Sequence, residues 1–223
     1  MNFVAIDFSL NSPGICIYND ESKRFHFISY IKEGSGTKKE QKLQEEIGLL
    51  GDVTLVKQPD FSVSKEYSSQ ELLKIRRYDV MSNQIISLIL NECTDGSGFT
   101  IAFEGSSYGS KMGTNNLIDM AAGAAILKMK MLSILKPTDI LTIAPTTIKK
   151  FAGKGNWNKR KVWDSFEQNM NNNESIETSE FFKFCKDLIE PENNKVPKPF
   201  DVLIKVPSFM PAITLNSVST PSF

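Results

Sequence analysis

The chain has 223 residues, of which 40% are hydrophobic and 23% charged, as expected for a globular protein with one substantial core. Its formal charge is zero, so a DNA-binding surface would need its positive charge gathered in one place. The three cysteines form no CxxC pair and His26 is the single histidine, which argues against a zinc site, a disulfide framework and a Ser-His-Asp triad. His26 is interpreted as structural, and any catalysis is expected to use carboxylates.

The first part of the chain predicts a three-stranded antiparallel meander. Short apolar runs at 2–8, 15–18 and 25–31 are separated by clusters of turn-forming residues. Residues 34–45 are polar and rich in glycine and lysine, and we interpret them as a loop.

Helices and strands alternate in the rest of the chain. A helix is expected around 69–92, with Ser69 as a candidate N-cap, followed by a strand at 99–103 that ends directly in Glu104. Residues 171–198 are interpreted as partly loop. The further predicted elements are a helix at 116–135, a strand at 140–143, and helices at 146–151 and 159–170. A meander followed by alternation predicts an α/β fold with a mixed sheet and helices on its faces.

Two acids stand at the ends of predicted central strands. Asp7 lies near the end of the first strand, and Glu104 follows the fourth. A carboxylate in an apolar strand is costly to bury, and two on neighbouring strands would repel each other unless a cation lay between them. Mg²⁺ favours one or two carboxylates together with waters and phosphate oxygens. Taken singly, Asp7 could instead cap a turn, and Glu104 could be a solvent-exposed acid.

Three segments together resemble the RuvC-type Holliday junction resolvases, in the version carried by bacteriophages. Residues 3–17 (FVAIDFSLNSPGICI) resemble the opening hairpin of that family, and residues 101–109 (IAFEGSSYG) its second catalytic strand. Residues 143–162 (IAPTTIKKFAGKGNWNKRKV) resemble its lysine-bearing loop between strand and helix. The first segment alone is shared with actin-like kinases and ATPases, but the three in order are more specific.

The resemblance implies an RNase H-like fold with a five-stranded mixed sheet, its first three strands antiparallel, flanked by helices. It implies a metal-dependent endonuclease of branched DNA, above all the four-way Holliday junction, in recombination or repair. Two Mg²⁺ ions, replaceable by Mn²⁺, would be held by Asp7, Glu104 and Asp201, with Lys159 as a catalytic or phosphate-binding lysine. A two-fold symmetric substrate that needs two nicks favours a homodimer, whose interface either long helix, 69–92 or 116–135, could supply.

Positive charge is concentrated where DNA contacts are expected. Lysines and arginines that neutralise phosphates release counterions, and a glycine-flanked loop lets backbone amides approach phosphates. Tyr108 is a candidate for stacking on a base, with core packing as an equal alternative. The lysine-rich segment could also be a solvated helix start. The predicted DNA-binding residues are Lys149, Lys150, Lys154, Lys159, Arg160, Lys161 and Tyr108.

The family pattern breaks near the end of the sequence. RuvC-type enzymes finish with Asp-x-x-Asp, but Asp201 is followed three positions later by Ile204, and residues 206–223 contain no charged residue. Ordinary divergence is one interpretation. A frameshift near codon 201 is another, because the frame offset by two bases permits an aspartate three codons on. We therefore expect a nuclease domain at 1–200, an atypical tail at 201–223, and poor or no cleavage by the chain as written.

Other interpretations stay open. A branched-DNA-binding protein with a degraded nuclease site would explain the broken pattern. An actin-like ATPase or kinase would need a second Asp-Gly phosphate hairpin and an adenosine motif, and the sequence shows neither. No run of 18 apolar residues and no basic segment before an apolar block occurs, so we expect no membrane span and a cytoplasmic protein, in the host cytoplasm if the sequence is viral.

Overall fold

The fold is known from a computed structural model of the chain. The residues that it describes are 1–32, 37–58, 65–94, 96–105, 114–154, 159–170 and 177–188. Among them, no helix has the length and apolar character needed to cross a membrane.

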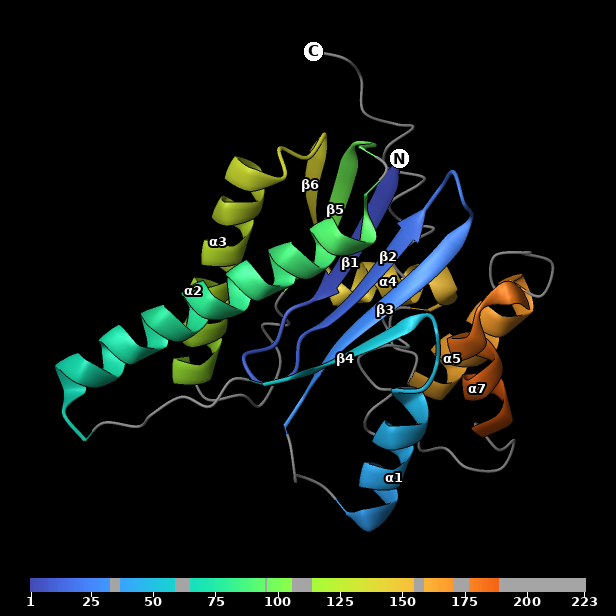
Figure 1. Cartoon of the computed structure of the whole chain (residues 1–223), viewed down its shortest axis with the longest axis horizontal. Coiled ribbons are helices and arrows are strands. Elements are labelled where there is room, and N and C mark those ends of the chain that lie inside the picture. Colours follow the sequence, from blue (N-terminus) through green and yellow to red (C-terminus); the bar gives the residue numbers. More distant parts are fainter. Residues whose placement is uncertain are drawn as a thin grey trace.

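A mixed sheet forms the centre of the molecule, with strand order β4-β3-β2-β1-β5-β6 (Figure 1). The pairs β1–β2 and β2–β3 are antiparallel, whereas β4, β5 and β6 each join their neighbour in parallel. The strands are β1 Asn2–Asp7, β2 Gly14–Asn19, β3 Arg24–Ile31, β4 Val53–Lys57, β5 Phe99–Glu104 and β6 Asp139–Ile143.

This topology is that of an RNase H-like fold, because the meander of β3, β2 and β1 continues into the parallel strands β5 and β6. The predicted mixed sheet with an antiparallel first part is confirmed. The predicted count of five strands was wrong, since β4 adds a sixth strand beside β3. Only Val53 of the five residues of β4 is buried, so this short edge strand lacks the apolar signal of the central strands.

The helices agree with the predicted ones except in two polar segments: residues 34–45, and residues 171–198, which were interpreted as partly loop but contain a helix at Glu180–Leu188. Residues 34–45 were expected to form a loop, but a helix begins at Lys38. Its capping box is formed by Thr37, whose Oγ1 accepts from the Glu40 amide at 3.3 Å, while Oε2 of Glu40 accepts from the Thr37 amide at 2.6 Å. The helices are α1 Lys38–Ile47, α2 Tyr67–Glu92, α3 Thr114–Ile134, α4 Pro145–Ala152, α5 Lys159–Met170 and α7 Glu180–Leu188.

The N-cap of α2 also differs from the expected Ser69. Glu66 is the N-cap residue, and its carboxylate accepts hydrogen bonds from the hydroxyls of Ser68 and Ser69, each at 2.8 Å. The helix begins at Tyr67, two residues before the start of the predicted helix at 69–92.

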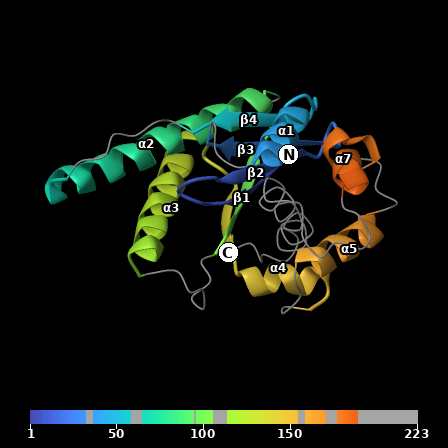
Figure 2. The same cartoon turned by 90° about the horizontal axis from the view of Figure 1, so that it is seen from below.

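Helices cover both faces of the sheet, as predicted. α2 and α3 lie on one side and α4, α5 and α7 on the other (Figure 2). The first face buries Ile6 and Phe103 against apolar side chains of α2 and α3. The second face carries Ala5 and Ala102 and packs against α1, α4, α5 and α7. Alternate residues of each strand thus belong to different cores.

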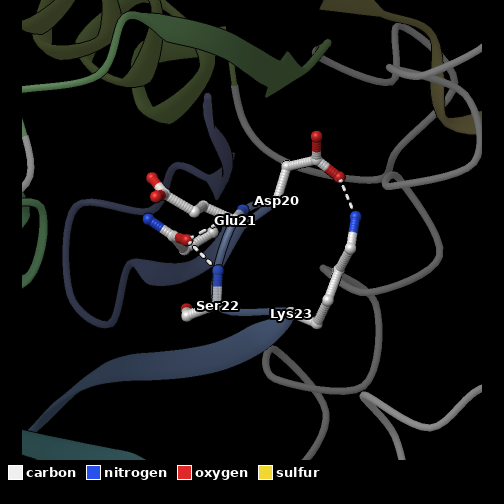
Figure 3. A network of polar contacts seen from close by, with 5 residues as sticks. Asp20, Glu21, Ser22 and Lys23 are labelled. Carbon is white, nitrogen blue, oxygen red and sulfur yellow. Dashed lines mark hydrogen bonds and ion pairs between the residues drawn. The ribbon is translucent and has the colours of Figure 1, made fainter.

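The turn between β2 and β3 holds the register of the meander at one end of the sheet (Figure 3). Oδ1 of Asn19 accepts from the Ser22 amide at 2.7 Å, and Nζ of Lys23 lies 2.6 Å from Oδ1 of Asp20. Nδ2 of Asn19 also donates to Oδ1 of the buried Asn2 at 2.8 Å. A slip of one residue would turn every side chain of β1 to the opposite face, so this network fixes the face on which Asp7 lies.

Candidate active site

Asp7 and Glu104 lie side by side at the ends of two central strands. β1 and β5 are parallel, with Ala5 opposite Ala102 and Ile6 opposite Phe103. The next position on each strand is an acid. Because adjacent strands are about 4.8 Å apart, the two carboxylates begin as close neighbours at one edge of the sheet.

Both acids belong to the face that α4, α5 and α7 cover. Side chains alternate along a strand, so Asp7 shares the side of Ala5, and Glu104 that of Ala102. Both alanines are fully buried, and the strand partner of Asp7 on β2 is Gly14. The neighbours of the pair on β1, β2 and β5 are therefore small residues, whereas Ile143 pairs with Glu104 from β6.

The environment of the pair suits a divalent cation. Asp7 and Glu104 are both partly buried, and Oε2 of Glu104 is shielded from solvent. Two ionised carboxylates on neighbouring strands would repel each other, and a cation with a preference for oxygen ligands would offset this repulsion. Within the described residues, no group of three or more His, Cys, Asp or Glu side chains could hold a metal ion. The predicted third ligand, Asp201, lies outside those residues.

The loop that follows Asp7 is held by residues that the sequence analysis did not identify. Nη2 of Arg77, on α2, donates to the carbonyl oxygen of Leu10 at 2.6 Å and to Oδ1 of Asn11 at 2.7 Å. Nε2 of Gln58, just beyond β4, donates to the carbonyl oxygen of Asn11 at 2.7 Å. These contacts join residues far apart in the sequence, and no local pattern marks them.

The structure describes only some of the predicted DNA-binding residues. α4 begins directly after β6, with Pro145 in its first turn, and its last turn carries Lys149 and Lys150. Ile148 of α4 and Trp163 of α5 are buried in the core on the acid-bearing face. The structure thus brings these two helices to the same side of the sheet as Asp7 and Glu104.

The basic side chains of this region differ in their surroundings. Lys150, Lys154 and Lys161 are exposed and Lys149 is partly buried. Nε of Arg160 lies 2.7 Å from Oδ1 of Asp164, and the Arg160 side chain is only 17% exposed. Lys159 is the first residue of α5, but its side chain, like Tyr108, lies outside what the structure describes.

A polar pocket of about 600 Å³ opens at the other end of the sheet, around Arg24, His26 and Glu92. Nε2 of His26 is 2.9 Å from Oγ1 of Thr54, and its Nδ1 is 3.4 Å from Oε2 of Glu92. Burial lowers the pKa of His26, while Glu92 and Asp52 act in the opposite direction. These contacts agree with the structural interpretation of His26 and place the pocket away from the acid pair.

Comparison with protein families finds no matching family model, and no curated protein matches the chain. Among solved structures, the chain is similar to Thermus thermophilus RuvC, with a TM-score of 0.47, 10% identity and 98% of each chain covered. T. thermophilus RuvC in complex with a Holliday junction substrate gives a TM-score of 0.47 and 9% identity over 98% of this chain and 97% of that chain.

The yeast mitochondrial Holliday junction resolvase Ydc2 is also similar, with a TM-score of 0.43 and 13% identity over 92% of this chain and 74% of that chain. The first two proteins bear the name of the family that the sequence motifs resemble. The fold assignment itself rests on the strand order and register given above.

Proposed function

We propose that the protein is a metal-dependent endonuclease that cleaves phosphodiester bonds in branched DNA, with the four-way junction as its substrate. The observation that supports this most is the placement of Asp7 and Glu104 at matching positions on adjacent parallel strands. The choice of substrate class follows from the three sequence segments taken together.

In this proposal the carboxylates of Asp7 and Glu104, with Asp201 as a third ligand, hold Mg²⁺ or Mn²⁺ at the edge of the sheet. When bound, two such cations supply an activated water and stabilise the leaving oxygen in phosphodiester hydrolysis. The protein's own part is to hold the two acids in a fixed register on buried strands, so that their positions do not depend on the substrate.

The basic side chains of α4 and α5 would hold the DNA. Lys149, Lys150, Lys154 and Lys161 would neutralise phosphates on the face that carries the acids. Arg160 would contribute less, because a phosphate would have to replace Asp164 as its partner. Lys159 is proposed as the lysine nearest to the scissile phosphate, and Tyr108 as a base-stacking residue.

A second copy of the chain is the proposed partner. Between residues 117 and 134, every exposed residue of α3 is uncharged. The polar residues of this part of the helix do not change that. Ile118, Met129 and Leu132 are 60%, 71% and 56% exposed and lie on one side of the helix with exposed alanines between them. Interface cores are depleted of charge, so two copies could pair here without burying an ion, and a two-fold dimer would match a two-fold junction.

The alternative is a branched-DNA-binding protein without cleavage. It is favoured by the two-carboxylate site, since among the described residues no third His, Cys, Asp or Glu side chain joins Asp7 and Glu104 to form a metal-binding group. A cleavage assay on a four-way junction at millimolar Mg²⁺ separates the two, with the Asp7→Asn variant as comparison. We expect weak cleavage by the chain as written, loss of cleavage in the variant, and junction binding by both. Binding without any cleavage by the unmodified chain would support the alternative, and full turnover would contradict the expected weakness of the site.

A further inference from the structure

The loop between Asp7 and Gly14 has weak support of its own. Oγ of Ser9 accepts from the amides of Asn11 and Ser12, but at 3.4 and 3.3 Å. Such long contacts contribute little, so the loop needs other elements to hold it in one conformation. Because the loop follows Asp7 directly, a movement of the loop would also displace the end of β1, which carries the Asp7 carboxylate.

Arg77 and Gln58 supply that support from two different elements. Nη2 of Arg77 makes two short bonds, to the carbonyl oxygen of Leu10 and to the side chain of Asn11. Gln58 adds a bond to the carbonyl oxygen of Asn11 at 2.7 Å and a longer one to that of Leu10 at 3.4 Å. The same two loop residues are thus held from α2 and from the end of β4.

The apolar side chains of the loop are also held in place, by packing against α3. Phe8 is 7% exposed. A Cβ atom at Gly123 of α3 would lie 2.9 Å from Cζ of Phe8 and 3.3 Å from Cδ2 of Leu10, so helix and loop are in close contact there. The loop therefore rests on α3 through apolar atoms and is tied to α2 and β4 through polar ones.

We propose that Arg77 and Gln58 are positioning residues that fix the loop after Asp7, and through it the geometry of the cation-binding carboxylate. This inference rests on the proposed function. A positively charged side chain that acted only through its charge would repel a cation, so removing it would strengthen cation binding. A positioning role predicts that removing the side chain weakens cation binding. A measurement of cation affinity therefore separates the two roles.

The test uses the full-length chain and Mn²⁺ as the probe. We expect Arg77→Met to weaken Mn²⁺ binding about tenfold or more, the range typical of residues that orient metal ligands. Hydrogen exchange of the amides of residues 8–12 should become faster in the same variant. Arg77→Lys keeps the charge and a donor but loses the planar guanidinium that fixes the geometry of the two bonds, so it should fall between the wild type and Arg77→Met. Gln58→Leu should act in the same direction with a smaller effect.

Arg76→Met is the matched control, since Arg76 is the exposed neighbour on the same helix and its loss changes the net charge equally. We expect unchanged or slightly tighter Mn²⁺ binding in this variant. Thermal unfolding of each variant shows whether it is folded at the temperature of the titration; if Arg77→Met is not, Asn11→Ala removes one of the two contacts in its place. Unchanged or tighter Mn²⁺ binding in the Arg77 and Asn11 variants would overturn the inference. Absence of Mn²⁺ binding by the wild type would instead remove the proposed function, and the inference with it.

Discussion

Asp7 and Glu104 occupy equivalent positions on neighbouring parallel strands, each one residue beyond the paired Ile6 and Phe103. Two ionised carboxylates so placed repel each other, and partial burial reduces the screening that water would give. A cation bound between the two carboxylates would offset this repulsion. This relationship makes a prediction about stability that does not require cleavage.

In the absence of divalent cations, we expect Asp7→Asn to unfold at the same temperature as the wild type or higher, because one of the repelling charges is gone. Addition of Mg²⁺ or Mn²⁺ should raise the Tm of the wild type but not that of the variant. A ligand that binds only the folded state at 100 times its Kd stabilises it by about 2.7 kcal/mol. Thermal unfolding with EDTA and with each cation measures both effects.

Asp187→Asn is the control, since Asp187 is exposed on α7 and its loss changes the net charge by the same amount. Its response to cations should equal that of the wild type. A wild-type Tm that does not respond to either cation would contradict a metal site at Asp7 and Glu104.

The acid pair could be predicted from the sequence because each acid directly follows a short apolar run. Such runs form central strands. Because these strands are buried, the positions of the two carboxylates at their ends are restricted. α1 could not be predicted in the same way, because its contacts with the core are made mainly by Leu43 and Ile47 and the rest of the helix is polar. β4 is a short edge strand with one buried residue and gives an equally weak pattern.

The residues that hold the loop after Asp7 could not be predicted at all. Arg77 follows another arginine on a helix, and nothing in its local sequence distinguishes the two. Only the crossing of α2 over the sheet brings Arg77 to Leu10 and leaves Arg76 in solvent. Asp201 and Tyr108 lie outside the described residues, so their roles stay predictions.

The basic residues of α4 and α5 should contribute unequally to DNA binding. Lys150→Gln and Lys154→Gln should each weaken junction binding and reduce the slope of log K against log salt by about 1, the effect of one lost phosphate contact. Arg160→Gln should change the slope less, because Asp164 already neutralises its guanidinium group at 2.7 Å. Binding isotherms over a series of salt concentrations measure these slopes.

Lys136→Gln serves as the comparison, since Lys136 is exposed just after α3, at the end of the sheet away from the acids. Its slope should match that of the wild type. If the Lys150, Lys154, Arg160 and Lys136 variants all lost the same junction affinity and the same salt slope, the positive charge would act only through the net charge of the protein.

His26 should make the protein less stable as the pH falls. Burial lowers its pKa in the folded state, and the attraction of Glu92 and Asp52 offsets this only in part. The unfolded chain, with a pKa of about 6.5, then binds the proton first. The free energy of unfolding should therefore fall as the pH drops below about 6.5, until the lower pKa of the folded state is passed.

Urea denaturation at a series of pH values from about 7.5 to about 5.5 measures this dependence, which spans the ordinary titration range of histidine. His26→Gln keeps a polar partner for Thr54 and should abolish the slope in that window. Since His26 is the single histidine of the sequence, no other imidazole can contribute. A free energy of unfolding that rises on acidification would mean that the ion pair with Glu92 dominates and that folding raises the pKa.

The exposed apolar side of α3 should determine the oligomeric state. Met129→Lys or Leu132→Lys places a charge in the proposed interface, where a second copy would have to desolvate it, so we expect the dimer to dissociate into monomers. Light scattering coupled to gel filtration measures the mass with and without junction DNA.

Ile134→Lys is the matched control, because Ile134 is 51% exposed on the same helix but lies on the opposite side from Ile118, Met129 and Leu132. Dissociation by the first two substitutions and not by the third would locate the interface on one side of α3. A wild-type chain that stays monomeric on four-way junction DNA would contradict the dimer, and the two nicks would then need two independent binding events.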